Sequence, residues 1–314
     1  MERRDFVRLG VSALAGGILA GHVGADAVPV SPLSTRPLGR TGQDSSVVAL
    51  GGIVVRDESQ EHANRIVDQA LRQGVNHVDV APSYGDAELK LGEALRGRRD
   101  RVFLACKTAQ RTRAGAEREM QASFERLQTD HFDLYQFHGL DKREDLETVL
   151  GPDGALQAVL AAREKGLVRH IGMTGHNPDN FLEALRRFPL DTCMFPINFA
   201  IQLHSDYGKR LMDELVAREI GIIAIKPIAA EGWAEGEHRR WHKCWYRPLD
   251  DPRQIELAVR WVLSLPVTTI VPSGHPQLFR RALAAARRAE PLRPEELADL
   301  NALAQGLTPV FGTA

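Results

Sequence analysis

Short apolar runs with the alternation of β-strands recur along the chain, and a stretch with the apolar spacing of an α-helix follows each one. The strand-like runs are residues 46–50, 76–80, 102–106, 133–137, 170–174, 194–198, 221–225 and 268–272. The helix-like stretches are residues 60–73, 87–95, 116–127, 154–165, 180–188, 209–219, 253–263 and 277–287. This repeated unit predicts parallel strands joined by crossover helices, and the number of units favours a closed (β/α)8 TIM barrel over an open sheet.

Polar residues stand where several of these strands end. Asp79 is near the end of the second strand, Lys107 follows the third and His138 follows the fourth, while Tyr84 is on the loop after the second. Because the loops at the carboxyl ends of barrel strands build the active site, we expect these four side chains to meet at one mouth of the barrel.

Each of these residues alone is more often a packing or surface residue than a catalyst. As a set they suit one chemistry. A phenol with an ordinary pKa near ~10 is a poor acid at neutral pH, but a nearby ammonium favours the phenolate. Lys107 would have this effect on Tyr84, Asp79 would keep the buried lysine charged, and His138 would orient a carbonyl oxygen. The set predicts a proton donor for a carbonyl group that receives a nucleophile such as hydride.

The chain from about Arg36 to Ala286 resembles the aldo-keto reductase family in several segments: PLGRTGQDSSVVALGG (37–52), VDVAPSYGDAE (78–88), KGLVRHIGMTGHN (165–177) and IKPI (225–228). The resemblance implies a (β/α)8 barrel with an N-terminal β-hairpin. It also implies that hydride passes between NADP(H) and a small aldehyde, ketone or corresponding alcohol, with Tyr84 as general acid or base. Asp79, Lys107 and His138 complete the family's tetrad.

The same resemblance implies a set of cofactor contacts. They are Gly51 and Gly52, Thr174 and Asn198 near the nicotinamide, and Lys226, Ser273, Gly274 and Arg280 toward the phosphates and adenosine. Three positions depart from the family pattern, because Gly175, Met194 and Ile225 replace the usual Asn, Gln and Tyr. The basic phosphate motif is also reduced to PSGHPQLFR, so NADP(H) is favoured and NAD(H) is possible.

Composition narrows the classes of partner. The 314 residues include 40 Lys and Arg and 41 Asp and Glu, and the basic residues are scattered, which argues against nucleic-acid binding. The three cysteines have no paired metal spacing, and their odd number argues against a disulfide framework. A small-molecule partner is therefore expected, with no bound metal.

One aromatic and basic segment, EHRRWHKCWYR (237–247), follows the seventh strand. We expect a substrate-covering loop in which Trp233, Trp241 and Trp245 contact the substrate, although packing on the barrel rim or a neighbouring subunit is about as consistent. A zinc site at His238, His242 and Cys244 is disfavoured because no fourth ligand is apparent.

The first residues resemble an export signal. Arg3, Arg4 and Phe6 precede an apolar run too short to span a bilayer, and ADA (25–27) offers a signal-peptidase site. We therefore predict a cleaved twin-arginine signal at residues 1–27, a linker at 28–35 and one domain at 36–314. The twin-arginine translocation machinery would be a partner, with periplasmic localisation and no stable membrane insertion. If the signal is not functional, the protein is cytoplasmic.

Two other functions remain open at this point. One is a barrel that binds NADP(H) as a redox sensor or partner subunit with little turnover. The other is a metal-dependent isomerase or hydrolase, which is disfavoured because no strand-end cluster of His and carboxylate residues appears.

Overall fold

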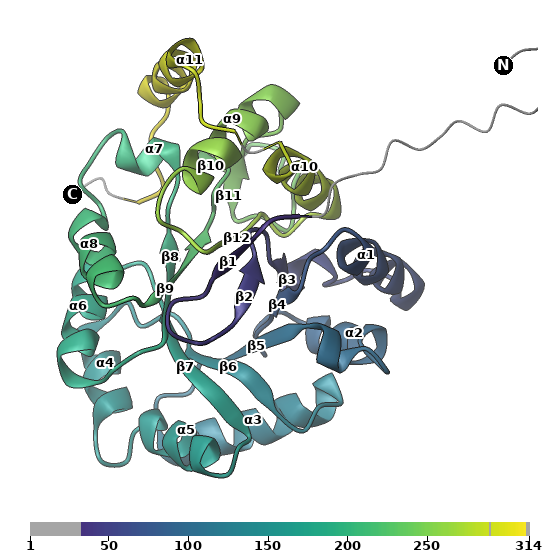
Figure 1. Cartoon of the computed structure of the whole chain (residues 1–314), viewed down its shortest axis with the longest axis vertical. Coiled ribbons are helices and arrows are strands. Elements are labelled where there is room, and N and C mark those ends of the chain that lie inside the picture. The colour runs from purple at the N-terminus through teal and green to yellow at the C-terminus, as the bar shows by residue number, and fades with distance from the viewer. Residues whose placement is uncertain (1–32, 289, 312–314) are drawn as a thin grey trace, which may run out of the picture. The chain divides into compact units, whose positions relative to one another are not determined.

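The computed structural model describes residues 33–288 and 290–311, which form the predicted eight-stranded barrel (Figure 1). Its parallel strands, in spatial order, are β3 (Leu50–Gly51), β4 (His77–Asp79), β5 (Phe103–Thr108), β6 (Phe132–Phe137), β7 (Val168–Thr174), β8 (Thr192–Pro196), β9 (Gly221–Ile225) and β12 (Thr269–Val271). The ring is closed by a parallel bridge between Val48 and Ile270, where the Ala49 amide donates to the Ile270 carbonyl at 2.9 Å.

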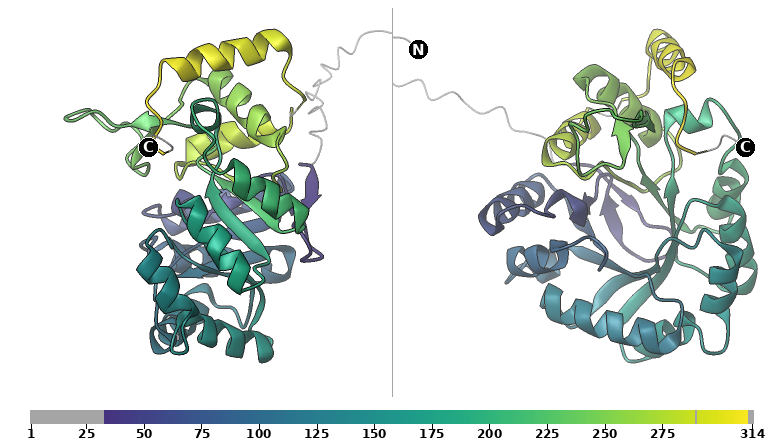
Figure 2. Two further views of the ribbon diagram at one scale, coloured as in Figure 1. Left: turned by 90° about the vertical axis from the view of Figure 1, so that its left-hand side faces the viewer. Right: turned by 180° about the vertical axis from the view of Figure 1, so that it is seen from behind.

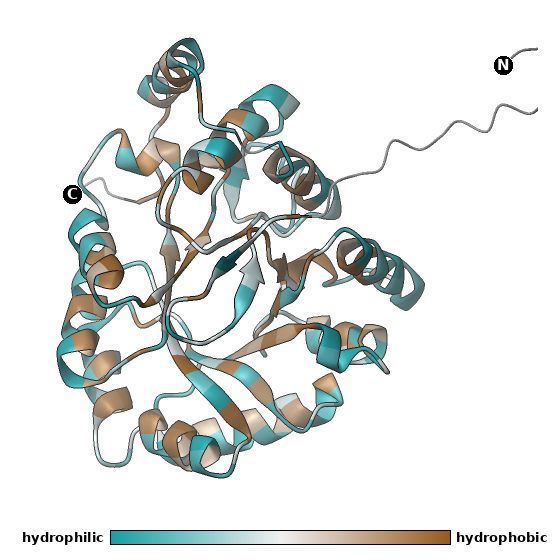
Figure 3. Ribbon diagram, in the orientation of Figure 1, coloured by the Kyte–Doolittle hydropathy of each residue, from teal (hydrophilic) through white to brown (hydrophobic). Residues whose placement is uncertain are grey.

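Helices surround the barrel, with their apolar faces toward the strands (Figure 3). They are α1 (Gln60–Arg72), α2 (Ala87–Ala94), α3 (Arg113–Leu127), α4 (Arg143–Leu150), α5 (Ala155–Glu164), α6 (Pro178–Arg187), α7 (Phe199–Gln202), α8 (Lys209–Ala217), α9 (Pro252–Leu263), α10 (Pro276–Ala286) and α11 (Pro294–Gln305). Two short 3₁₀ turns, η1 (Gly52–Val54) and η2 (Arg99–Arg101), complete the connections. Burial of these amphipathic faces is the main stabilisation of such helices.

The predicted N-terminal hairpin is present as β1 (Thr35–Pro37) and β2 (Asp44–Ser46), and it lies across one end of the barrel (Figures 1 and 2). Leu38, at its turn, is fully buried inside the barrel with an apolar cluster that includes Phe103 and Leu134. Leu33 is also buried, and Thr35 already pairs with Ser46. The last residues of the predicted 28–35 linker therefore belong to the fold.

The observed elements differ from the predicted ones at several places. The first barrel strand is shorter than residues 46–50, because Ser46 pairs within the hairpin before the chain enters the ring. Helix α3 begins three residues early, since the Thr112 hydroxyl caps it by accepting from the Gly115 amide at 3.3 Å. The pattern also gave no sign of α4, α7, α11 or the hairpin of β10 (Ala229–Gly232) and β11 (Tyr246–Pro248).

The predicted signal at residues 1–27 lies outside the described residues. In the part of the chain that the structure describes, no helix combines the length and apolar character needed to cross a membrane.

Candidate active site

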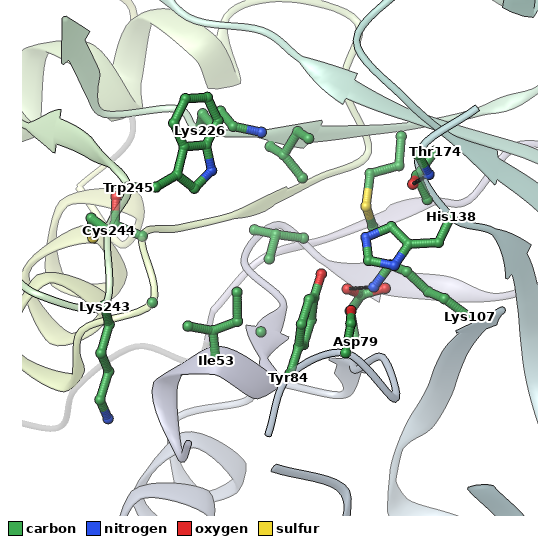
Figure 4. Close-up of a pocket in the computed structure, with 18 of the residues that line it drawn as sticks. Ile53, Asp79, Tyr84, Lys107, His138, Thr174, Lys226, Lys243, Cys244 and Trp245 are labelled. Atoms are coloured by element: carbon green, nitrogen blue, oxygen red, sulfur yellow. Dashed lines mark hydrogen bonds and ion pairs between the residues drawn. The ribbon is translucent and has the colours of Figure 1, made fainter. Parts of the chain in front are cut away.

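A cavity of about 340 Å³ opens at the carboxyl ends of the strands (Figure 4). The N-terminal hairpin lies across the opposite end of the barrel (Figure 2). Its lining comes from strand ends and from loops that are far apart in the sequence. All four residues of the predicted tetrad, Asp79, Tyr84, Lys107 and His138, line it. The parallel strands place these side chains together, because each one stands at or just beyond the end of its strand.

Lys107 and Asp79 form a fully buried ion pair at the centre of this group. The Lys107 ammonium also donates to the Val80 carbonyl at 3.2 Å, and the second Asp79 oxygen accepts from Gln136 Nε2 at 2.8 Å. Gln136 was not predicted as a site residue, although a polar side chain in a buried strand and in register with Lys107 was a usable signal. Gln136 therefore fixes the carboxylate that holds Lys107.

Tyr84 and His138 face each other above this pair (Figure 4). Their rings are edge to face with centroids 5.8 Å apart, and the Lys107 ammonium lies 5.1 Å from the centroid of the Tyr84 ring. The phenol and the imidazole thus point into one space, where a carbonyl oxygen could contact both.

The protonation states follow from burial and neighbouring charge. Burial alone would lower the pKa of Lys107, but the Asp79 carboxylate reverses this and raises it above the ordinary value. Burial raises the pKa of Tyr84, and the opposing effect of Lys107 only moderates the rise, so the net lowering expected from the sequence is not found. Burial and the cationic neighbours lower the pKa of His138 to about 3. The phenol is therefore protonated and the imidazole neutral at pH 7.

The residues expected to contact a cofactor fall into two groups. Gly51, Thr174, Lys226, Ser273 and Gly274 line the cavity. Gly52, Asn198 and Arg280 do not.

The three residues outside the cavity have other positions. Gly52 lies against Val80, whose Cγ2 would be 2.7 Å from an added Cβ. Arg280 is exposed on α10 and borders a small hollow against α1. Asn198 caps α7 and donates to the Lys226 carbonyl at 3.1 Å.

Lys226 belongs to a chain of ionisable groups beside the tetrad. Its backbone is in the left-handed region at φ 59°, and its ammonium contacts His176 Nε2 at 3.0 Å. The other ring nitrogen, His176 Nδ1, contacts Asp141 Oδ2 at 2.8 Å. Burial lowers the pKa of Lys226 to about 7. The roles of His176 and Asp141 were not predicted from the sequence.

The aromatic loop only partly covers the cavity. Trp245 lines it, whereas Trp233 and Trp241 border a separate hollow next to α11. Lys243 fastens the loop across the mouth through a 2.6 Å ion pair with Glu58, and the Tyr246 hydroxyl contacts Ser273 Oγ at 2.8 Å.

No group of three or more His, Cys, Asp or Glu side chains within residues 33–288 and 290–311 is placed to hold a metal ion. His238, His242 and Cys244 therefore do not converge on a common point in this structure.

The model of the aldo/keto reductase family matches residues 48–244, and this chain belongs to that family of oxidoreductases. L-galactose dehydrogenase of Arabidopsis thaliana is 29% identical over 236 residues, which cover 68% of this chain and 71% of that protein. An uncharacterized oxidoreductase of Bacillus subtilis is 26% identical over 208 residues, and the match covers 62% of this chain but only 64% of that relative.

Two further comparisons cover more of the chain. Methylglyoxal reductase of Salmonella typhimurium is 25% identical over 84% of this chain and 92% of its own length. The holo form of an aldo-keto reductase from Bacillus halodurans superposes with a TM-score of 0.68 at 23% identity, covering 90% of this chain and 99% of that one. This last likeness agrees with the barrel described above.

Proposed function

We propose that this protein is an NADP(H)-dependent reductase of small aldehydes or ketones, and of the corresponding alcohols in reverse, with Tyr84 as the general acid. The observation that carries the proposal is the buried Asp79–Lys107 pair beneath the Tyr84 phenol and the neutral His138 imidazole. The similarity to a methylglyoxal reductase supports a small carbonyl substrate.

Each side chain has a separate task in this mechanism. The raised pKa of Tyr84 keeps the proton on the phenol until a carbonyl oxygen begins to accept it. Lys107 then stabilises the phenolate that forms, since its own charge is maintained by Asp79. Neutral His138 can donate one N–H to the same oxygen and orient it. A bound nicotinamide supplies the hydride.

The cavity fits the nicotinamide end of such a cofactor. Met194, Ile225 and Val271 give one wall an apolar surface suited to a flat ring. The Thr174 oxygen accepts from the Gly139 amide at 3.0 Å, which leaves its own O–H available to a carboxamide. At the phosphate end, the Ser273 hydroxyl pairs with Tyr246 and Arg280 lies outside the cavity, so the test compares NADPH with NADH.

The test is a steady-state assay of the purified protein with NADPH or NADH against a panel of neutral and anionic aldehydes and ketones, combined with fluorescence titration of each cofactor. We expect turnover with NADPH. Tight cofactor binding without reduction of any carbonyl compound would instead support the sensor or partner-subunit role and contradict this proposal.

We also propose export by the twin-arginine route, which carries folded proteins and would let the barrel acquire its cofactor first. The support is the pattern of Arg3, Arg4 and the apolar run before ADA (25–27). Cell fractionation and N-terminal sequencing test it, with a mature chain expected to start near Val28. Cytoplasmic protein that retains residues 1–27 in a host with working export would contradict it.

A further inference from the structure

The setting of Lys226 differs from that of the other cations at the cavity. Lys107 pairs with Asp79, Lys243 pairs with Glu58, and Arg56 pairs with Asp57 at 3.1 Å. Among the described residues, no carboxylate lies within ion-pair distance of Lys226, although it lines the same cavity and is 92% buried, with a relative exposure of 8%. A buried cation without an opposite charge is costly, so this position favours an anion supplied from outside the chain.

The neighbours of Lys226 fix the direction of its ammonium. Asp141 accepts the Nδ1 proton of His176, which leaves the Nε2 lone pair to accept from Lys226. Trp245 and Phe311 place their rings 5.5 and 5.3 Å from the ammonium. One of the hydrogen-bond donor positions of the Lys226 ammonium is thus occupied, and aromatic rings flank it. Figure 4 shows the ammonium directed over the cavity.

The left-handed backbone at Lys226 supports this orientation. Asn198 Nδ2 and the Ala229 amide both donate to the Lys226 carbonyl, at 3.1 and 3.0 Å. A non-glycine residue rarely adopts this conformation unless its surroundings hold it there, and such positions cluster at ligand sites. Asn198 therefore acts as a positioning residue for Lys226.

Lys226 also lies close to the reacting centre. It lines the same cavity as Tyr84 and His138, the groups that contact the carbonyl in the proposed function. A ligand anion on Lys226 would therefore be in the same cavity as the carbonyl bound between Tyr84 and His138.

We propose that Lys226, oriented by His176 and Asp141, is an anion subsite that selects carbonyl substrates carrying a carboxylate or phosphate group. This inference rests on the proposed function and names its substrate class. The phosphates of the cofactor offer the same chemistry, but Lys226 contacts His176 and lines the same cavity as Tyr84 and His138, which favours the substrate as the source.

The experiment compares matched pairs of probes, 4-carboxybenzaldehyde against 4-formylbenzamide and 4-oxobutanoate against butanal. For each pair, kcat/KM of the acid divided by that of the neutral partner measures anion selection. We expect the wild type to prefer at least one acid, and Lys226→Met to lower that ratio at least tenfold, mainly through KM. Lys226→Arg should retain most of the preference, which guards against loss by misfolding.

Lys243→Met is the matched control, since it removes a buried cavity cation that already has a carboxylate partner. Its acid-to-neutral ratio should stay within threefold of the wild type. A ratio near one in the wild type, or one that is unchanged in Lys226→Met, overturns the proposal. So does a tenfold weaker NADPH affinity in Lys226→Met with an unchanged ratio, because the anion would then be a cofactor phosphate.

Calorimetric binding of 4-(hydroxymethyl)benzoate and its amide in the presence of NADPH, with which an alcohol cannot react, separates this inference from the proposed function. Preferential binding of the acid that is lost in Lys226→Met supports the subsite even if no carbonyl is reduced. Reduction of neutral carbonyl compounds with no preference for an acid in binding or turnover leaves the proposed function standing and overturns the subsite.

Discussion

Strand β4 carries two buried polar side chains, His77 and Asp79, which the fold accommodates in opposite ways toward the two ends of the barrel. His77, toward the hairpin-covered end, is fully buried, and its Nδ1 contacts the Ser45 hydroxyl at 2.9 Å. Burial lowers its pKa to about 4, so it is neutral at pH 7. Asp79, two residues further along, is equally buried but belongs to an ion pair with Lys107.

The difference between these two residues reflects the free-energy cost of burying a charged side chain. A buried charge requires an opposite charge and well-placed hydrogen bonds, and a neutral group in the same protein avoids that cost. His77 meets the requirement by neutrality, while at the open end Lys107 stays charged through Asp79 and Gln136. Lys226 is the exception at the open end, because its partner His176 is not a carboxylate.

The largest expected effect comes from removing the acid group of the open end. Tyr84→Phe should lower kcat by about 10²–10⁴-fold, the usual contribution of general acid catalysis, while cofactor affinity changes only a few-fold. Steady-state assays and NADPH titration measure both. Tyr135→Phe is the matched control, since it deletes another buried phenol hydroxyl that has no hydrogen-bond partner among the described residues. Comparable kcat for the two variants would contradict the role of Tyr84.

The second prediction removes the carboxylate that keeps Lys107 charged at the open end of the barrel, and it concerns the stability of the fold. Asp79→Asn leaves Lys107 buried without a carboxylate, which costs about 3–5 kcal/mol in the free energy of unfolding. Urea titration measures this, and Asp57→Asn, which breaks the partly exposed pair with Arg56, should cost less than about 1 kcal/mol. Equal costs would mean that the buried pair is no more important than a surface pair.

The same variant should reverse a pH dependence. In the wild type the pKa of Lys107 is raised above its unfolded value, so its contribution to stability is present below about pH 10 and is lost at higher pH. In Asp79→Asn burial lowers that pKa below the unfolded value, and the contribution of Lys107 to stability should instead increase toward pH 10.

A smaller effect concerns the unpaired cation of the open end. Because the pKa of Lys226 is about 7, the preference for an acidic substrate should decline as the pH rises above 7. Other ionisable groups lie near this ammonium, namely His176, Asp141 and His138, so the variant Lys226→Arg is needed to identify the titrating group. The arginine stays charged and should flatten the profile of the acid-to-neutral ratio; an unchanged slope would assign the titration to a neighbour.

The smallest effect tests the closed end. Between its unfolded pKa near 6.5 and its folded pKa of about 4, His77 binds a proton only in the unfolded state, so stability decreases as the pH falls. At pH 5.5 this amounts to about 1 kcal/mol for one such histidine. His77→Gln should reduce the loss between pH 7 and 5.5, measured by urea titration, whereas the exposed-loop variant His238→Gln should not.

The barrel was predictable from the sequence because each strand and helix has its own periodicity. Residues 221–225 form a continuous run of apolar residues and glycine, and they become strand β9 of the ring. Helix α4 escaped prediction because only Leu146 and Val149 are buried in a short polar segment. The sequence of the β10–β11 hairpin does not alternate between apolar and polar residues. Its position depends on tertiary contacts such as the hydrogen bond from Trp233 Nε1 to the Cys244 carbonyl, which the sequence does not reveal.

The tetrad was predictable because strand ends in a barrel converge whatever the details of the loops. Side-chain directions were not. Trp233 and Trp241 turn away from the cavity and Arg280 faces α1, although all three follow strands that lead to the mouth. The pairing of Asp141, His176 and Lys226 joins loops after three different strands, and no sequence spacing encodes it.

The junction that closes the barrel, between the segment before β3 and β12, forms late in the synthesis and folding of each chain. Val48 forms a parallel bridge to Ile270, and Arg36 Nη1 donates to the carbonyl of Val267, 231 residues away along the chain, at 2.7 Å. During synthesis the first strand therefore leaves the ribosome long before its partner exists. Its edge stays unpaired until most of the polypeptide has emerged, and joining such distant segments carries a large loop-closure entropy. Until the last strand pairs with this edge, its pairing competes with association of the open edge with another chain.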